Sequence, residues 1–283
     1  MKPVNTYEEY LALLKRKKQE AGKLIMNSYL SPDKIMRYIE LQRLYYVEQE
    51  KGIIFLCDEE KYYRLLYWLG SGATPEIPKT DKPIAIRNVF KEGKKKEEMV
   101  FLDEQFEKLG FRKEYVAVEM CVPLEQKTFI ARQKMIHERM LKKGKFRIGL
   151  MQKENVEKML LLRETKEFHV YNFEYKTRDE YFEEIEKDQY LAVYSEDEEM
   201  CACIYTEELT GAMTGDGICV EEKYRQTYGL GAALMSYVLD KALNQLEKRY
   251  VSWCEVENTN SMKFHKSIGF EVTGKISEEW ILE

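Results

Sequence analysis

The sequence predicts an α/β protein with a mixed α+β sheet, built from two domains. Apolar runs typical of strands alternate with segments of helical periodicity along the 283 residues. Residues 217–234 read as a strand, a glycine loop and a helix start in succession. The segment Phe106–Phe111, a helix end followed by Gly-Phe and a strand, has the same spacing as His265–Phe270. A chain of this length is long enough for two ordinary domains.

The first half begins with two predicted helices. One covers residues 6–26, and the second starts at Ser31, where a serine N-cap followed by Pro32 is a good start signal, and continues to Gly52. Aromatic and β-branched residues then predict strands. The remaining elements expected in this half are strands at 53–57, 62–69, 83–90 and 111–122, a helix at 99–109 and a linker helix at 124–143.

The second half is expected to begin after Gly144, so we place the domains at 1–143 and 144–283. A helix from Gly229 has apolar residues at helical spacing and is expected to pack on the sheet. The other predicted elements are strands at 146–151, 190–194, 200–206, 211–220 and 250–256, and helices at 155–168 and 179–187.

Composition excludes several classes of protein. With 44% hydrophobic and 34% charged residues, the chain can bury real cores, so global disorder is not expected. No apolar run approaches the length of a membrane span, and residues 1–18 lack a signal-peptide core. The six cysteines form no Cys-x-x-Cys pair and lie in apolar contexts. We therefore expect a cytoplasmic protein with reduced cysteines, no metal site and no membrane partner.

Charge is distributed unevenly. Residues 1–145 hold 29 Lys and Arg against 22 Asp and Glu, and the remainder holds 16 against 28. Each half either has a solvated face of its own sign, or the acidic half favours a cationic substrate such as an amine. Nucleic-acid binding is poorly supported, because Lys and Glu alternate in the basic half and no aromatic-basic module is present.

The glycine stretch has a physical reason to bind an anion. A strand that leads through glycines into a helix gathers unpaired backbone N–H groups at the positive end of the helix dipole. Gly229 and Gly231 let a ligand lie against the main chain. The same pattern also occurs where a helix simply packs tightly on a sheet, so it becomes specific only with a second motif.

That second motif lies downstream. Gln-x-x-Gly-x-Gly at 226–231 and Asn-x-x-Ser-x-x-x-His-x-x-x-Gly-Phe at 258–270 are separated by one helix and one strand. Together they resemble the GNAT superfamily of acyl-CoA-dependent N-acetyltransferases, and Val220 followed by Tyr224-Arg225 also matches the family. The resemblance covers roughly residues 145–280 and implies the GNAT acyl-CoA N-acyltransferase fold there.

The resemblance also implies a cofactor and a reaction. It implies transfer of an acetyl group from acetyl-CoA to a primary amine, by direct attack in a ternary complex. The strand before the loop is implied to splay from its neighbour, so that a backbone N–H reaches the acyl carbonyl. The residues implied to bind acetyl-CoA are Ile218, Cys219, Val220, Arg225, Gln226, Thr227, Tyr228, Gly229, Leu230, Gly231, Ala232, Asn258, Ser261 and His265.

The catalytic residues are less closely matched. A proline usual in the family is replaced by Glu222, and the usual tyrosine five residues before Gly-Phe is replaced by His265. At neutral pH a fraction of an imidazole is protonated, so His265 could donate to the departing thiolate, and a nearby carboxylate could raise that fraction. The alternative is a helix-end histidine favoured by the dipole. Asp216 is the candidate base, with Glu207 and Glu255 as alternatives.

The acceptor is an amine-bearing small molecule whose identity the sequence does not give. The family commonly builds its acceptor pocket where His169, Tyr171, Phe173 and Tyr175 lie, although an ordinary aromatic core fits these residues as well. Nothing between Pro83 and Met99 resembles a phosphate loop, so the first half is expected to be a degenerate GNAT-like domain. The rival to an enzyme is a catalytically silent acyl-CoA-binding or partner-binding protein.

Overall fold

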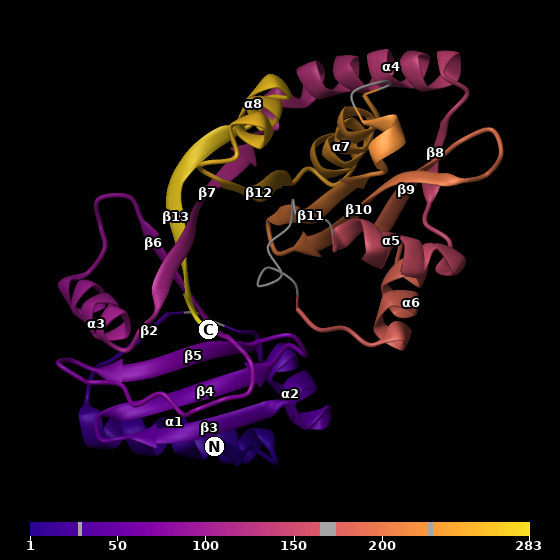
Figure 1. The fold of residues 1–283 in the computed structure, drawn as a ribbon. Coiled ribbons are helices and arrows are strands. Elements are labelled where there is room, and N and C mark those ends of the chain that lie inside the picture. The colour runs from indigo at the N-terminus through magenta and orange to yellow at the C-terminus, as the bar shows by residue number, and fades with distance from the viewer. Residues whose placement is uncertain (28–29, 165–173, 226–228) are drawn as a thin grey trace. The chain divides into compact units, whose positions relative to one another are not determined.

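A computed structural model describes residues 1–27, 30–164, 174–225 and 229–283, apart from the side chain of Asp216 (Figure 1). The chain forms two compact units. The first contains Met1–Ala117, Tyr171–Tyr175 and Gly274–Glu283, and the second contains Val118–Val170 and Lys176–Thr273. Both units combine helices with strands of a mixed sheet, which confirms the predicted α/β class.

The first unit has a sheet with strand order β1-β3-β4-β5-β6-β13-β7, and β2 pairs with β5. Most neighbouring strands are antiparallel, while β5 and β6 run parallel. Its elements are β1 (Lys2–Pro3), α1 (Tyr7–Ala21), β2 (Leu24–Met26), α2 (Pro32–Glu40), β3 (Leu44–Gln49), β4 (Gly52–Asp58), β5 (Tyr63–Gly70), β6 (Ile84–Lys91), α3 (Glu97–Lys108), β7 (Arg112–Val122) and β13 (Glu271–Leu282).

The central strands of this unit are buried on both faces. Along β4, Ile54 packs into a cluster with Phe106 of α3, while its neighbour Phe55 packs into a second cluster with Tyr10 of α1 and Tyr38 of α2. A strand covered on both sides needs apolar residues at every position, because successive side chains point to opposite faces. This explains the continuous apolar run at 53–57 that predicted a strand.

The predicted helix from Ser31 to Gly52 is too long. Helix α2 ends at Glu40, Gln42 has a left-handed φ of 56°, and residues 44–49 form β3 against β4. The apolar residues after 43 fit a helical spacing as well, but Leu-Tyr-Tyr-Val is a run of strand formers, and it pairs with β4 in the sheet. In the same way, the helix predicted to reach Met26 ends at Ala21, where Gly22 takes a φ of 71°.

The second unit has strand order β7-β12-β11-β10-β9-β8. Its further elements are η1 (Leu124–Gln126), α4 (Lys127–Lys143), β8 (Arg147–Leu150), η2 (Lys153–Asn155), α5 (Val156–Arg163), α6 (Arg178–Glu186), β9 (Tyr190–Tyr194), β10 (Met200–Leu209), β11 (Ala212–Val220), η4 (Glu222–Tyr224), α7 (Leu230–Asp240), the π-helical turn η5 (Lys241–Gln245), β12 (Arg249–Glu255) and α8 (Thr259–Ser267).

Two layers of helix cover this sheet. Helix α7 packs on one face, where Leu234 and Val238 are fully buried against Ile204 of β10. Helices α5 and α6 pack on the other face, towards which Cys203 and Tyr205 of the same strand point. Sheet and helices therefore enclose two cores, one on each side of β10.

The compact units do not divide at the predicted boundary of 143/144. Helix α4 belongs to the second unit, because its Ile130 and Leu141 are part of the core that α7 forms. The end of β13 belongs to the first unit, where it pairs with β6 from Lys275 opposite Lys91 to Leu282 opposite Ile84. A linker that looks like an isolated helix in the sequence is thus part of a core.

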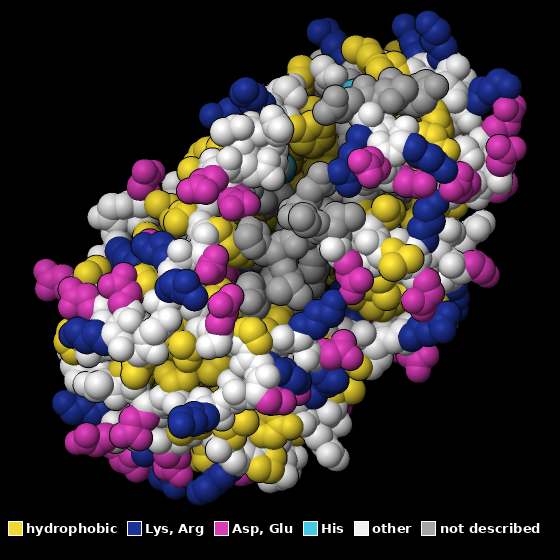
Figure 2. All heavy atoms as spheres, in the orientation of Figure 1, with side chains coloured by type: hydrophobic (Ala, Val, Ile, Leu, Met, Phe, Trp, Pro, Cys, Tyr) yellow, Lys and Arg dark blue, Asp and Glu magenta, His cyan; other side chains and the backbone are white. Residues whose placement is uncertain are grey.

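Surface charges are largely paired. Figure 2 shows one face of the molecule, on which Lys and Arg side chains are interspersed with Asp and Glu. Examples are Lys223 with Glu199 at 3.0 Å and Lys153 with Glu186 at 2.5 Å. On this face, neither the basic nor the acidic side chains form a large patch of a single charge. Among the described helices, none is long and apolar enough to cross a membrane.

Candidate functional site

The start of α7 is open to an anion. Gly229 precedes the helix with a left-handed φ of 62°, no side chain caps the helix, and its first turn has no acidic residue. The first N–H groups of a helix have no partner within the helix, and in α7 these are the groups of Leu230, Gly231 and Ala232. Four earlier helices, α1, α2, α3 and α6, all have carboxylates in their first turns. The N-terminus of α7 therefore carries the helix dipole without a built-in counter-charge.

Gly231 lies close to the strand that leads to it. A Cβ atom added to Gly231 meets the Cγ2 atoms of Ile218 and Val220 at 3.5 and 3.6 Å, which is ordinary van der Waals contact. The sequence motif thus serves helix packing, yet the packing itself has room for a methyl group. Gln226, Thr227 and Tyr228, which complete the predicted loop, lie outside the described residues.

Arg225 holds the end of the strand before the loop. Its Nε donates a hydrogen bond of 3.0 Å to the carbonyl oxygen of Val220. Cys219 is buried on the opposite side of β11, in the core with α5 and α6. Cys219 therefore points to one face of the sheet, and Ile218 and Val220 point to the other. A ligand on one face could contact the backbone of all three residues but not all three side chains.

Strands β11 and β12 are paired at one end. Their described parallel register runs from Ala212–Thr214 against Arg249–Val251, while β11 continues to Val220 and β12 to Glu255. A thioester inserted between two such strands would meet backbone N–H groups near their carboxyl ends. This arrangement is the one expected if β11 diverges from β12 beyond Thr214.

Helix α8 begins with the predicted asparagine. Asn258 is its N-cap, and the side-chain oxygen accepts a hydrogen bond of 2.9 Å from the backbone N–H of Ser261. Asn258 therefore has a structural role as a helix cap, and this cap does not require its amide NH₂ group. The hydroxyl of Ser261 in turn accepts a contact of 3.2 Å from the thiol of Cys254.

His265 is buried, and its environment differs from the expected one. Its side chain is 7% exposed, and Nδ1 lies 2.8 Å from the carbonyl oxygen of Ser261. Because a carbonyl only accepts, Nδ1 carries the hydrogen and Nε2 holds the lone pair of the neutral ring. Burial lowers the pKa of His265, while the hydrogen bond to the Ser261 carbonyl opposes this shift in part.

Asp216 lies in the middle of β11, where its backbone stands opposite Tyr205 of β10. Its side chain is outside the description. The tyrosine opposite it belongs to a polar cluster on the α6 side of the sheet, which the sequence analysis did not identify. The sequence contains one indication of this cluster. Tyr181 and Glu184 are three residues apart and share one face of the predicted helix, and Lys176 lies just before the helix begins.

The centre of this cluster is Glu184 of α6. Its carboxylate accepts hydrogen bonds from the ammonium of Lys176 at 2.6 Å, from the hydroxyl of Tyr190 at 3.2 Å and from that of Tyr205 at 3.5 Å. The ammonium also lies 4.3 Å from the ring centroid of Tyr205 and 5.8 Å from that of Tyr181. A carboxylate and two aromatic faces thus surround one primary ammonium group.

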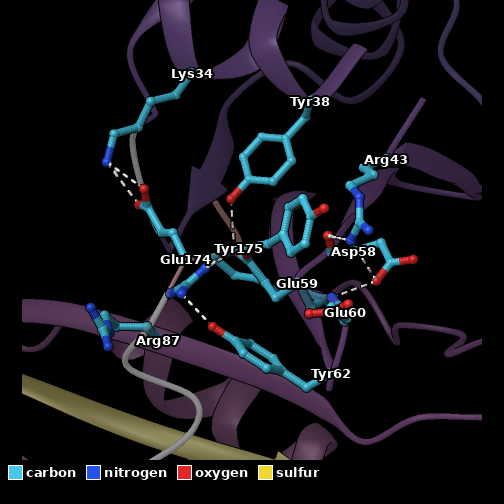
Figure 3. Close-up of polar contacts among 12 residues, drawn as sticks. Lys34, Tyr38, Arg43, Asp58, Glu59, Glu60, Tyr62, Arg87, Glu174 and Tyr175 are labelled. Carbon is cyan, nitrogen blue, oxygen red and sulfur yellow. Dashed lines mark hydrogen bonds and ion pairs between the residues drawn. The ribbon is translucent and has the colours of Figure 1, made fainter. Parts of the chain in front are cut away.

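A second buried polar cluster lies in the first unit, around Glu59 (Figure 3). Its side chain is fully buried, and the carboxylate accepts hydrogen bonds from the hydroxyl of Tyr38 at 2.7 Å and from Nε of Arg64 at 2.9 Å. Arg64 also donates to the hydroxyl of Tyr62. Buried charges persist only when they are paired and hydrogen-bonded, and Glu59 satisfies both conditions.

The same cluster binds a segment distant in sequence. The backbone N–H of Tyr175 donates to Glu59 at 2.7 Å, and its carbonyl oxygen accepts from the guanidinium of Arg37. Arg43 lies 3.6 Å from the ring centroid of Tyr175, and Lys34 pairs with Glu174 at 2.7 Å (Figure 3). Tyr175, predicted as a possible wall of the acceptor pocket, is therefore fixed by the first unit. His169, Tyr171 and Phe173 lie outside the described residues.

The cysteines and metal ligands give no further site. All six cysteines are free thiols, and burial raises the pKa of Cys57 and Cys254. Within residues 1–27, 30–164, 174–225 and 229–283, no three His, Cys, Asp or Glu side chains gather as a metal site.

Sequence comparison identifies the class of the second unit. Residues 156–270 match the model of the acetyltransferase (GNAT) family. This range includes the start of α7 and all of α8, so the resemblance to GNAT acetyltransferases based on the two motifs is confirmed for this part of the chain. No curated protein sequence matches the chain.

Solved structures with a similar fold extend the comparison to the whole chain. A tandem GNAT protein from the clavulanic acid biosynthesis pathway is 10% identical with a TM-score of 0.56, and the match covers 100% of this chain and 97% of that one. A GCN5-related N-acetyltransferase from Sphaerobacter thermophilus is 10% identical with a TM-score of 0.56, covering 93% and 96%. A Drosophila protein is 14% identical with a TM-score of 0.53, covering 99% and 97%. The fold is therefore the GNAT fold, in the tandem form that the repeat predicted.

Proposed function

We propose that this chain is an N-acetyltransferase that transfers an acetyl group from acetyl-CoA to a primary amine of a small molecule. The observation that carries the proposal is the uncapped start of α7, which has a left-handed glycine and no carboxylate in its first turn, inside a region that matches the GNAT family model. Such a helix start binds a pyrophosphate through backbone N–H groups and needs no basic side chain.

The reaction joins two bound substrates directly. A neutral amine attacks the carbonyl carbon of the thioester, an oxyanion forms, and the thiolate of CoA leaves as the amide is made. The chain must hold both reactants, stabilise the oxyanion, and move one proton from the amine and one to the thiolate. The backbone of Leu230–Ala232 would hold the pyrophosphate, and the backbone of β11 near Val220 would face the acyl group.

Proton transfer is assigned to His265 and to Asp216. A lowered pKa keeps the imidazole neutral at pH 7, with Nε2 unprotonated. Nε2 then accepts the proton that the attacking amine loses, and the imidazolium donates that proton to the departing thiolate. Loss of the amine proton can also occur in water when part of the amine is already neutral. Asp216 lies on the strand that faces the thioester and is the proposed base for amines that arrive protonated.

One observation favours a second candidate function. His265 stands where the family usually has a tyrosine, and its burial disfavours the cationic form more than the hydrogen bond to the Ser261 carbonyl favours it. A chain that binds acyl-CoA without a proton donor for the thiolate would be a catalytically silent acyl-CoA-binding protein. The two functions share the binding step and differ in turnover.

A panel of amines incubated with acetyl-CoA and the full chain, with free thiol as the readout, tests the proposal. Release of CoA that depends on one class of amine supports the transferase. Saturable binding of acetyl-CoA by calorimetry, with no amine-dependent release of thiol, supports the silent binder. Absence of binding contradicts both functions.

A further inference from the structure

The ammonium group of Lys176 lies in a site built from two other elements, α6 and β10. Glu184 of α6 accepts its hydrogen bond at 2.6 Å, and Tyr205 of β10 and Tyr181 of α6 turn their ring faces towards it at 4.3 and 5.8 Å. Lys176 and Glu184 side chains are each only 17% exposed. A half-desolvated ammonium that meets a carboxylate and two aromatic faces is held by charge and by cation–π attraction together.

The walls of this site are rigid without the lysine. Tyr190 is 1% exposed, and its hydroxyl holds the second oxygen of Glu184 at 3.2 Å, so the carboxylate keeps its direction whether or not an ammonium is present. Tyr181 is 8% exposed and belongs to the core beneath α5 and α6. A binding site that keeps its shape when empty needs little further ordering of side chains, so less free energy is lost when a ligand binds.

Lys176 itself is not part of that framework. It lies in the extended chain just before Thr177, the N-cap of α6, and the capping box of Thr177 and Glu180 forms without it. The lysine can therefore leave the site by rotating its own side chain, while α6 stays in place. Its long, flexible stem makes that exchange easier than for a residue within the helix.

A surface pair between Lys153 of η2 and Glu186 of α6 shows the difference. Lys153 pairs with Glu186 at 2.5 Å and lies 5.2 Å from the ring centroid of Phe182. Its side chain is 42% exposed and that of Glu186 is 63% exposed, so water competes for both charges. The pair at Glu184 has the same residue types in a setting from which water is largely excluded.

From these contacts we propose that Glu184, Tyr181 and Tyr205 form the ammonium-binding subsite for the acceptor, and that Lys176 fills it when no acceptor is bound. The acceptor then carries a primary alkylammonium group, with an unbranched methylene stem like that of lysine next to the charge. This inference rests on the proposed function, because a bound amine is the acceptor only if the chain is an acetyltransferase. The binding chemistry stands on the contacts alone.

The test uses the Lys176→Ala variant of the full chain, with n-butylammonium as the probe. At tenfold its dissociation constant, the amine is expected to raise the melting temperature of Lys176→Ala by about 3 °C, in a saturable way. At the same amine concentration, wild type and Lys153→Ala should show a clearly smaller rise, because Lys176 competes with the amine for the subsite in both. n-Butanol, which lacks the charge, should have no effect on any variant.

A second variant separates the subsite from general effects of the amine. Adding Glu184→Gln to Lys176→Ala should abolish the rise, because the amide removes the charge that binds the ammonium. An equal rise in that double variant, or no saturable rise in Lys176→Ala, would overturn the subsite. If Lys176→Ala binds the amine while no amine is acetylated by wild type, the subsite stands and the transferase proposal fails. If wild type acetylates amines while Lys176→Ala binds none, the transferase stands and this inference fails.

Discussion

Phe106 and His265 occupy the same position in two copies of one helix end. The carbonyl oxygen of Phe106 accepts a hydrogen bond of 3.0 Å from the N–H of Phe111, and that of His265 accepts one of 3.1 Å from Phe270. The glycine before each phenylalanine is left-handed, with φ of 96° at Gly110 and 94° at Gly269. This six-to-one bond around a left-handed glycine is a Schellman cap. The repeat predicted from six residues is present in the backbone of both units.

The pair also shows what is unusual about the histidine. Phe106 is 1% exposed and packs in an apolar core against Tyr67 and Phe111, with ring centroids 5.6 and 5.4 Å away. His265 contacts Phe270 in the same way at 4.8 Å, yet it is polar and needs the carbonyl of Ser261 as a partner. Phenylalanine fills this position in the first unit, so packing does not require a histidine at 265. We therefore look to function for the reason that an imidazole is present.

We therefore predict that His265→Phe folds normally and loses turnover. The phenyl ring is flat like the imidazole but larger, so the free energy of unfolding should fall by no more than about 1–3 kcal/mol. Acetyl-CoA affinity should be unchanged, while turnover falls by about tenfold to a thousandfold if the ring moves a proton. Calorimetry and steady-state kinetics measure the two effects. An unaltered rate would assign proton transfer to water or to another group.

The histidines also predict how stability depends on pH. Burial lowers the pKa of both His265 and His137 in the folded chain. Below about pH 6.5 the unfolded chain therefore binds more protons than the folded one, and stability falls as the pH is lowered. The melting temperature of His265→Phe should fall less between pH 7 and pH 5 than that of wild type. Equal falls would mean that His265 does not contribute.

The glycines at the start of α7 allow folding and ligand binding to be separated. Gly231→Ala adds a methyl group in ordinary contact with β11 and removes a helical glycine, so stability should be kept or raised by about 0.5 kcal/mol. The methyl group also fills space between the helix start and β11, close to the proposed pyrophosphate site, so acetyl-CoA affinity should fall. Calorimetry measures the affinity, and thermal melting provides the control. Unchanged affinity would place the pyrophosphate elsewhere.

Gly229 is the matched position with a different constraint. Its φ of 62° is left-handed, so a β-branched residue is strained there, while asparagine adopts this conformation more readily. Gly229→Val should cost about 1–2 kcal/mol of stability, and Gly229→Asn clearly less. Urea unfolding of the two variants measures the difference. Equal costs would show that the backbone conformation is not the reason for glycine.

The elements near the proposed active site could be predicted because each is local. A glycine before a periodic helix, or an asparagine after a strand, has a meaning within a few residues. The clusters at Glu59 and Glu184 could not be predicted in this way. Glu59 joins Tyr175 across 116 positions, and nothing in the neighbourhood of either residue indicates the other. The error in the predicted helix beyond Glu40 has a related cause. Residues 44–49 form a strand because they pair with β4, and the local sequence does not show that pairing.

Glu59 gives a prediction about buried charge. Its carboxylate serves three donors in a site without water access, whereas Lys34 and Glu174 form a pair whose side chains are 41% and 29% exposed. Glu59→Gln should lower the free energy of unfolding by about 3 kcal/mol, because the guanidinium of Arg64 loses its buried counter-charge. Lys34→Ala should cost less than about 1 kcal/mol. Urea unfolding of both variants compares them, and a smaller loss in Glu59→Gln than in Lys34→Ala would contradict the role of the cluster.

The last prediction concerns the boundary at 143/144. A chain cut there loses pieces from both units. Residues 118–143 provide the end of β7 and helix α4 to the second unit, and residues 274–282 provide a strand between β6 and β7 to the first. Ile130 and Leu141 leave one core, and Trp280 and Ile281, which are 3% and 2% exposed, leave the other. Each large apolar side chain removed from a core costs about 2–5 kcal/mol, and several are lost at once, so neither 1–143 nor 144–283 should fold alone.

Co-expression of the two pieces supplies the control for this prediction. Together they contain every strand, so they should assemble into one complex that melts cooperatively, while each piece alone shows no cooperative transition by circular dichroism. The complex should also bind acetyl-CoA, because the start of α7 and its supporting helix α4 are then both present. If 144–283 alone melts cooperatively and binds acetyl-CoA as tightly as the full chain, α4 and β7 are dispensable and the boundary at 143/144 is the true one.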